Sequence, residues 1–292
     1  MLYLYLSKTQ IMKKIVGLLS SSLVACFFLI TGPVAVTSCE KEIIRDTIII
    51  TDTLTIVDTV CYDLKDGLIA WYNFNGATLK DSSGNNNHIN FSNAVATTDR
   101  FGKPNNAYLF NGTSSYMTVP NSTSLNPNLI SIAATVKLNG FYTGPCHLNN
   151  ILSKGSPDDV NGFYMMRVGT YQDCSAITDT TKEIFAAAFG NNNNPYGSAA
   201  GAGSDTLKVR TGRWYQVVYT YDGTISKMYI DGKLVSSLVK SATTSGNSQD
   251  LFIGKHNSSQ FPYWFNGIID EIRIYNKPLC EGAVKQMYKQ KS

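Results

Sequence analysis

Residues 266–275 read Asn-Gly-Ile-Ile-Asp-Glu-Ile-Arg-Ile-Tyr, and the alternation of their side chains predicts a β-strand. Because successive side chains of a strand point to opposite faces, Ile268, Ile272 and Ile274 are expected on one face. Asp270 falls on the same face as these isoleucines. A carboxylate on an apolar face is costly unless it is paired, hydrogen-bonded or bound to a metal. The strand is therefore expected to carry a buried acid with a specific partner.

The same period-two alternation, broken by turn residues, continues through most of residues 62–292. Further strands are expected at residues 67–74, 107–112, 116–119, 130–138, 150–154, 163–168, 184–189, 206–210 and 251–254, and a short helix at 281–290. Three more strands, within residues 214–235, are joined at Asp222-Gly223 and Asp231-Gly232, because glycine accepts the positive φ of hairpin turns. The low share of charged residues, 16%, suits a β-sandwich with polar loops.

Several of these segments resemble the laminin-G-like, concanavalin A-like jelly-roll domains of bacterial surface proteins. They are the closing strand at 267–275, the loop Asp-Ser-Ser-Gly-Asn at 81–85, Phe-Asn-Gly at 110–112 and the run 214–223. The resemblance implies an all-β fold of two antiparallel sheets over residues 62–292, with a short C-terminal helix. It says less about the ligand, because this fold hosts lectins, glycanases and structural spacers.

The N-terminus is typical of an exported protein. Lys13 and Lys14 precede an apolar run at 15–30, which predicts a secretory signal peptide over residues 1–38. Val36-Thr37-Ser38-Cys39 resembles a lipobox, in which Cys39 would be lipidated and become the mature N-terminus. Ordinary cleavage and an uncleaved anchor are the alternatives. The acidic residues after Cys39 resemble the surface-export signal of Bacteroidetes lipoproteins, so we expect a lipid anchor in the outer membrane of the cell envelope, with surface display left open.

Residues 39–61 contain a repeat of six residues with Asp-Thr in each copy. A period of six fits neither a helix nor a coiled coil, and the β-branched residues also disfavour helix. We expect an extended stalk, with an edge strand of the domain as the alternative. The repeated Asp-Thr-apolar triads resemble the O-glycosylation motif of Bacteroidetes envelope proteins, which marks Thr47, Thr53 and Thr59.

Four cysteines remain outside the signal peptide and the lipidation site, namely Cys61, Cys146, Cys174 and Cys280. An even number in an exported domain favours disulfides, and three pairings are possible. The resemblance to the family favours Cys146–Cys174, in loops that flank neighbouring strands, and Cys61–Cys280, at the two ends of the domain. Four unpaired thiols are the alternative.

The same resemblance implies a structural calcium ion. Asp270 would be its main charged ligand, and Asp81, Asn111 and Gly112 lie in the loops expected to complete the site. Outside the cell, millimolar calcium can fill a weak site of six to eight oxygen ligands. The metal-free alternative is that Asp270 accepts hydrogen bonds from backbone N–H groups of those loops.

The sequence disfavours catalysis and nucleic-acid binding. A retaining glycanase needs two carboxylates about 5–5.5 Å apart, but neither Glu183 nor Glu271 has a second acid two or four residues away in its own strand. The three histidines show no metal-binding spacing, and no nucleophile elbow or phosphate-binding loop is present. The net charge of +4 is spread along the chain without a basic stripe.

A non-catalytic module that binds a glycan is therefore the leading interpretation. Such sites stack sugar rings on exposed aromatic side chains and bond the hydroxyls with amides and carboxylates. Two loops offer these groups, and the predicted binding residues are Asn191, Asn193, Tyr196, His256, Tyr263 and Trp264. Two alternatives stay open. The module could bind a surface protein or serve a structural role, with its aromatic residues capping the sandwich, and a glycoside hydrolase is less favoured.

Overall fold

The computed structural model describes residues 43–44, 49–50, 54–55, 60–155, 163–169, 184–190, 208–239 and 246–290. The chain divides into two compact units, Met1–Tyr62 and Asp63–Ser292. Cys39, Thr47, Thr53 and Thr59 lie outside the described residues, so the lipidation and glycosylation hypotheses stay predictions. Among the described parts of the chain, no helix has the length and hydrophobicity to cross a membrane.

The N-terminal unit contains four two-residue strands. Strand β1 (Ile43–Ile44) pairs with β4 (Val60–Cys61), and β2 (Ile49–Ile50) pairs with β3 (Leu54–Thr55), both antiparallel. In these pairs, backbone N–H and C=O groups of the N-terminal unit form hydrogen bonds with each other. These eight residues therefore lie in paired strands, whereas the predicted stalk was a single extended chain.

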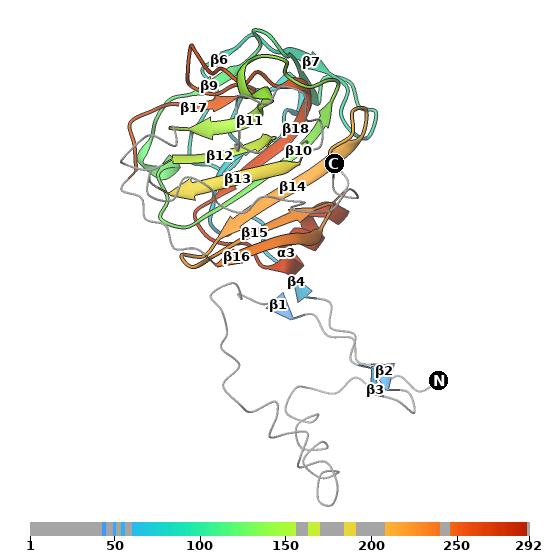
Figure 1. Ribbon diagram of the computed structural model, residues 1–292. Coiled ribbons are helices and arrows are strands. Elements are labelled where there is room, and N and C mark those ends of the chain that lie inside the picture. Colours follow the sequence, from blue (N-terminus) through green and yellow to red (C-terminus); the bar gives the residue numbers. More distant parts are fainter. Residues whose placement is uncertain are drawn as a thin grey trace, which may run out of the picture. The chain divides into compact units, whose positions relative to one another are not determined.

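The second unit is a sandwich of two antiparallel sheets (Figure 1). The eight-stranded sheet runs in the order β16 (Lys233–Val239), β15 (Ile225–Ile230), β14 (Trp214–Tyr221), β10 (Ile130–Leu138), β18 (Asn266–Tyr275), β8 (Ala107–Asn111) and β7 (Val95–Thr97), and β5 (Leu68–Tyr72) also pairs with β18. The six-stranded sheet runs in the order β13 (Phe185–Gly190), β12 (Phe163–Val168), β11 (Asn149–Lys154), β17 (Leu251–Ile253), β9 (Met117–Val119) and β6 (Phe91–Ser92). Helix α3 (Glu281–Lys289) follows the closing strand. The predicted fold class is confirmed.

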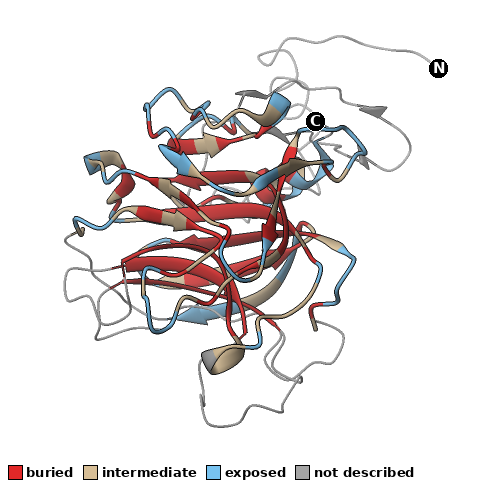
Figure 2. Cartoon of the chain, turned by 90° about the horizontal axis from the view of Figure 1, so that it is seen from above, coloured by how far each residue is buried: buried red, intermediate tan, exposed pale blue. Residues whose placement is uncertain are grey.

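The core lies between the two sheets, and buried residues are concentrated in the strands (Figure 2). Ile132 and Val217 contribute from the eight-stranded sheet, and Ile151 and Ile253 from the six-stranded sheet, all fully buried. Each buried side chain of this size contributes about 1.5–3 kcal/mol through the hydrophobic effect. Because the core fixes both sheets, side chains on their outer faces are held in defined positions.

The predicted turns join the strands of the edge hairpins. Asp231 and Gly232 have φ of 51° and 76°, as a two-residue turn between β15 and β16 requires. At the preceding turn, Oδ1 of Asp222 accepts backbone hydrogen bonds from Thr224 and Ile225. The strand expected at 206–210 is not found, because its described residues, 208–210, form no ladder.

A β-bulge changes the expected faces of β18. Ala134 of β10 lies opposite Ile272 but Thr135 lies opposite Asp270, so Glu271 is an extra residue on β18. The bulge reverses the alternation beyond it, and Ile269 joins Ile272 in the core in place of Ile268. The prediction that Asp270 shares the core face with the isoleucines is therefore wrong, and Asp270 lies on the outer face beside Glu271.

Asp81 holds its own loop. Its Oδ1 accepts backbone hydrogen bonds from Trp71 and Ser83, each at 2.8 Å, and its Oδ2 accepts the Ser83 hydroxyl at 2.8 Å and the Asn87 backbone N–H at 3.0 Å. Asp81 is buried. Its carboxylate is thus satisfied by four hydrogen bonds, which tie the loop to strand β5.

The cysteines differ in part from the prediction. Cys280 stands at the N-cap position of α3 and is a thiol, so the predicted Cys61–Cys280 disulfide is not formed. The prediction used this bond to join the end of the stalk to the sandwich, whereas Cys61 belongs to β4, which pairs within the N-terminal unit. Cys146 is disulfide-bonded. Cys174 lies outside the described residues, so the Cys146–Cys174 pair stays a prediction.

Candidate functional site

Four aromatic rings gather on the outer face of the six-stranded sheet. Phe91 of β6 and Phe252 of β17 lie on either side of Thr118 of β9, each opposite it in the ladders. The ring of Tyr116 lies 4.8 Å from that of Phe91 and 6.3 Å from that of Phe252, and Trp264 lies 6.1 Å from Tyr116. We call these four rings the aromatic platform.

The platform is partly open to solvent. Phe91 is 42% exposed, and the other three rings are partly buried. Strand alternation explains this position, because the neighbours Leu251 and Ile253 point into the core and Phe252 must point outward. Exposed aromatic groups held side by side on a rigid sheet form a surface on which a flat apolar ligand face can lie.

Lys255 lies at the centre of the platform. Its Nζ is 4.8 Å from the ring centroid of Tyr116 and 5.2 Å from those of Phe252 and Trp264. A cation over aromatic rings is attracted by their electron-rich faces. Partial burial lowers the pKa of Lys255 below its usual value. Gly254 precedes it with φ of 82°, and a Cβ there would lie 2.2 Å from the Phe110 ring, so the chain can turn here only with glycine.

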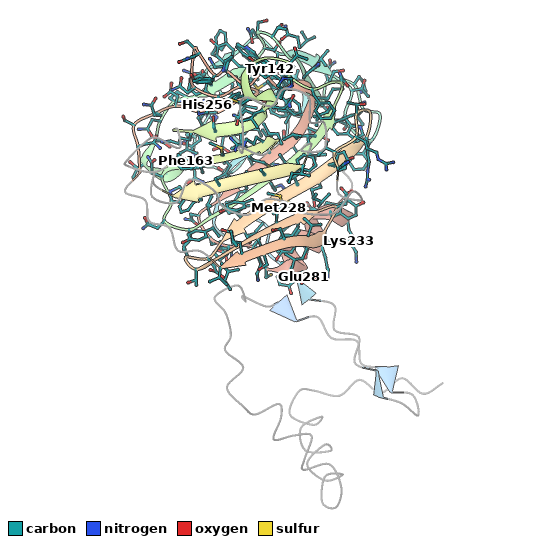
Figure 3. The ribbon with its side chains drawn as sticks, viewed as in Figure 1. Tyr142, Phe163, Met228, Lys233, His256 and Glu281 are labelled. Carbon is teal, nitrogen blue, oxygen red and sulfur yellow. The ribbon has the colours of Figure 1, made fainter. Side chains whose placement is uncertain are left out.

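The binding residues that the sequence predicts lie in different environments. Trp264 joins the platform, but His256 and Tyr263 are each only 6% exposed. The Tyr263 hydroxyl donates to Sγ of Cys146 at 3.6 Å, and its ring lies 5.6 Å from that of His256, which Figure 3 labels. These two residues are therefore buried beneath the loop surface, and their contact with a ligand stays a prediction.

Asn191, Asn193 and Tyr196 lie outside the described residues. Phe91, Tyr116 and Phe252 were not among the predicted binding residues. The signal for Phe252 was available, since it alternates with two core residues of β17 and must face outward.

Asp270 lies in a second region, on the outer face of the eight-stranded sheet. There it lines a cleft of about 290 Å³, which we call the β18 cleft, together with Trp71, Asn73, Asn75, Arg100, Glu271, Arg273 and Gln290. Asp270 is 6% exposed, and its Oδ1 accepts the backbone N–H of Glu271 at 2.7 Å. Burial raises the pKa of Asp270 to about 6, although this hydrogen bond and the charge of Arg100 oppose the rise.

Glu271 is the hub of the β18 cleft. Its Oε1 accepts hydrogen bonds from Nε1 of Trp71 at 2.9 Å and from Nε of Arg273 at 2.7 Å, and Arg273 also forms an ion pair with it. The guanidinium of Arg273 lies 4.7 Å from the Trp71 ring and donates to Gln290 at the end of α3. This network ties β5, β18 and α3 together.

The residues predicted to bind calcium are not assembled. Asn111 lies opposite Asn266, four residues from Asp270 along β18, which is about 13 Å in a strand. Oδ1 of Asn111 accepts three backbone hydrogen bonds in its own turn, which Gly112 shapes, and both oxygens of Asp81 are engaged as described. The described residues contain no cluster of three metal-binding side chains. This ligand set does not fit calcium.

Comparison with known proteins places the fold. Residues 111–285 match a protein family that is described as "Concanavalin A-like lectin/glucanases superfamily". A similar solved structure is domain 4 of AbnA, a GH43 extracellular arabinanase from Geobacillus stearothermophilus, in complex with arabinotriose. Its identity to this chain is 21% and its TM-score 0.55, and the match covers 76% of this chain and 98% of that one.

Two toxin domains are also similar. The binding domain of Paraclostridial Mosquitocidal Protein 1 has 14% identity and a TM-score of 0.53, and the binding domain of Botulinum Neurotoxin DC in complex with SialylT has 14% and 0.50. Each match covers 77% of this chain but 52% of the toxin domain, so the chain spans about half of their length. No curated protein sequence matches. The match over residues 111–285 shows that the chain belongs to the concanavalin A-like lectin/glucanases superfamily.

Proposed function

We propose that this protein is a non-catalytic carbohydrate-binding module and that the aromatic platform is its ligand surface. The observation that carries the proposal is the convergence of Phe91, Tyr116, Phe252 and Trp264 on one outer face, around a single lysine. The apolar face of a sugar ring can stack on such rings, while its rim of hydroxyl groups stays in water. The arabinotriose and SialylT complexes of similar folds support this at the level of the fold.

Lys255 adds a preference to this surface. Its ammonium group is held over three rings, where no carboxylate among the described residues forms a salt bridge with it. A sugar that carries a carboxylate could stack on the rings and neutralise this charge at the same time. The platform should therefore bind acidic sugars more tightly than neutral sugars of similar shape.

The arrangement of the acids supports a role without catalysis. Asp270 and Glu271 both line the β18 cleft, which would be the natural place for a glycosidase pair. However, Glu271 is held by Trp71 and Arg273 through its Oε1, so it serves as a structural anchor. A nucleophile or base must be able to approach the substrate.

The proposed setting is the cell envelope. We propose that lipidated Cys39 anchors the protein to the outer membrane and that the module reaches glycans or surface proteins from there. Replacing Cys39 with serine should shift the protein from the membrane fraction to the soluble fraction and remove the lipid mass. If both the fractionation and the mass are unchanged, the anchor is not Cys39.

A glycan array probed with the purified full-length protein tests the binding function. The matched variants are Trp264→Ala, in the platform, and Phe261→Ala, an exposed aromatic in the same loop that is not part of it. We expect carboxylated glycans to bind the wild type and Phe261→Ala, and binding by Trp264→Ala to fall at least about tenfold, which is about 1.4 kcal/mol. If no glycan binds, the alternative of a protein-binding or structural module is favoured. If both variants bind as the wild type does, the aromatic platform is not the ligand surface.

A further inference from the structure

A second cleft lies on the outer face of the eight-stranded sheet, beside α3. It has a volume of about 400 Å³, and Trp214 and Gln216 of β14 line it together with Tyr288 of α3. We call it the α3 cleft. It shares Arg100 and Gln290 with the β18 cleft, so the two clefts are adjacent. Their volumes are typical of sites for small ligands.

Gln216 is an unusual residue in the wall of the α3 cleft. It is 5% exposed, and its Oε1 accepts no hydrogen bond from any residue that the structure describes. The backbone around it is fixed, because the Gln216 N–H donates to Oδ1 of Asp231 at 2.9 Å. A buried acceptor without a donor is costly, so it requires an explanation. A ligand that donates a hydrogen bond inside the cleft would supply one.

Asp270 offers a comparable acceptor in the β18 cleft. Its Oδ1 is bonded to the Glu271 N–H, whereas its Oδ2 accepts no hydrogen bond from the described residues. Asp270 is 6% exposed and lines the cleft. Arg100 lines the cleft of each acceptor, and its guanidinium donates to Thr135 at 2.6 Å.

The charges of the two clefts are balanced. The cations that line them are Arg100, Arg273 and Lys289, and the anions are Asp231, Asp270 and Glu271. A strongly charged ligand would therefore meet as much repulsion as attraction. A ligand with many hydroxyl groups can donate to Gln216 and Asp270 and accept from Arg100, and Trp214 offers a partly exposed aromatic wall.

We infer that the β18 cleft and the α3 cleft form one groove that binds a neutral oligosaccharide, with Gln216 and Asp270 as the hydroxyl acceptors. This groove is on the opposite sheet from the aromatic platform, so it is a second ligand site. It differs from the platform in chemistry, because the platform presents an unbalanced positive charge and the groove does not. It does not depend on the platform's binding a glycan.

The test uses the full-length protein, with arabinotriose, xylotriose, cellotriose and mannotriose as probes in isothermal titration calorimetry. The key variant is Gln216→Met, which keeps the side-chain length but removes the polar amide. Gln249→Met, at an exposed glutamine, is the control. We expect at least one trisaccharide to bind the wild type and Gln249→Met alike, and to bind Gln216→Met at least tenfold more weakly.

The melting temperature separates a ligand contact from a structural role. Methionine leaves no unsatisfied acceptor, so Gln216→Met should melt at the same temperature as the wild type or higher. The inference is overturned if none of the four sugars binds the wild type, if Gln216→Met binds as the wild type does, or if its melting temperature falls. Loss of trisaccharide binding in Trp264→Ala with full binding in Gln216→Met would also overturn it, while leaving the platform's function intact.

Discussion

The ammonium nitrogen of Lys255 lies 5.2 Å from the centroid of the Trp264 ring, and the same nitrogen is 4.8 Å from the ring of Tyr116. The lysine follows β17, the tyrosine precedes β9, and the tryptophan precedes β18. Three separate parts of the chain thus place one positive charge on an aromatic surface. Because burial disfavours the charged form of Lys255, this arrangement lowers the unfolding free energy by an amount that can be measured without a ligand.

Replacement of Lys255 by methionine should reveal that cost. The pKa of Lys255 is lowered by burial, so the folded protein favours the neutral amine more than the unfolded chain does. The unfolding free energy of the wild type, relative to Lys255→Met, should therefore rise as pH increases through the lowered pKa toward the ordinary value of 10.5. Urea unfolding at several pH values measures this. The opposite slope would show that the rings favour the charged amine over the neutral one.

Asp270→Asn should stabilise the protein at neutral pH. Burial raises the pKa of Asp270 from 3.8 to about 6, so this group favours folding when protonated, and that contribution is lost as pH rises through about 6. This shift in the pKa of Asp270 corresponds to a change of about 3 kcal/mol in the unfolding free energy. Relative to the wild type, Asp270→Asn should gain about that much unfolding free energy between pH about 3 and about 7.

Chemical denaturation at several pH values checks this prediction, with the exposed Asp66→Asn as the control. An Asp270→Asn variant that is less stable at neutral pH would contradict it, because that result would mean that the ionised carboxylate has a strong partner.

Glu271→Gln should be strongly destabilising. The change removes the charge that pairs with Arg273 and disturbs the hydrogen bond from Trp71. The side chains of Glu271 and Arg273 are both largely buried. We expect a loss of about 3 kcal/mol in unfolding free energy. Glu281→Gln removes the acid of an exposed pair with Lys285 and should cost less than about 0.5 kcal/mol. Equal effects of the two changes would contradict the role of Glu271 as the hub of the network.

Calcium should not stabilise the protein through the residues predicted for it. The oxygens of Asp81 and Asn111 are occupied by backbone N–H groups, and Asn111 is four strand residues from Asp270. We therefore expect the melting temperature to be unchanged when a chelator is added. A melting temperature that rises with calcium, and fails to rise in Asp270→Asn, would show that Asp270 binds the ion with other oxygens.

The fold could be predicted from the sequence because its signals are local. Alternation located β10 at Ile130–Leu138 to the residue, and Asp231-Gly232 fixed the hairpin between β15 and β16. The closing strand was also located correctly at Asn266–Tyr275, but the face of Asp270 was not. The extra residue opposite Thr135 depends on how β18 pairs with β10, and no periodicity within one strand reveals it.

The candidate site could be predicted only in part, for a similar reason. Trp264 lies in a loop with other polar and aromatic residues, which the sequence shows. Its partners Phe91 and Tyr116 lie 173 and 148 residues earlier in the sequence, and only the pairing of β9 with both β6 and β17 brings them to Phe252. His256 and Tyr263 have the residue types of ligand contacts, but both are buried and Tyr263 donates to Cys146, which no local sequence pattern reveals.

A crystal structure of the full-length protein with the strongest glycan from the array would show whether the aromatic platform is the ligand surface. We expect a sugar ring stacked within about 4 Å of Phe91 or Trp264, with a carboxylate or hydroxyl of the glycan at hydrogen-bond distance from Nζ of Lys255. A glycan bound elsewhere, with the aromatic platform bare, would contradict it.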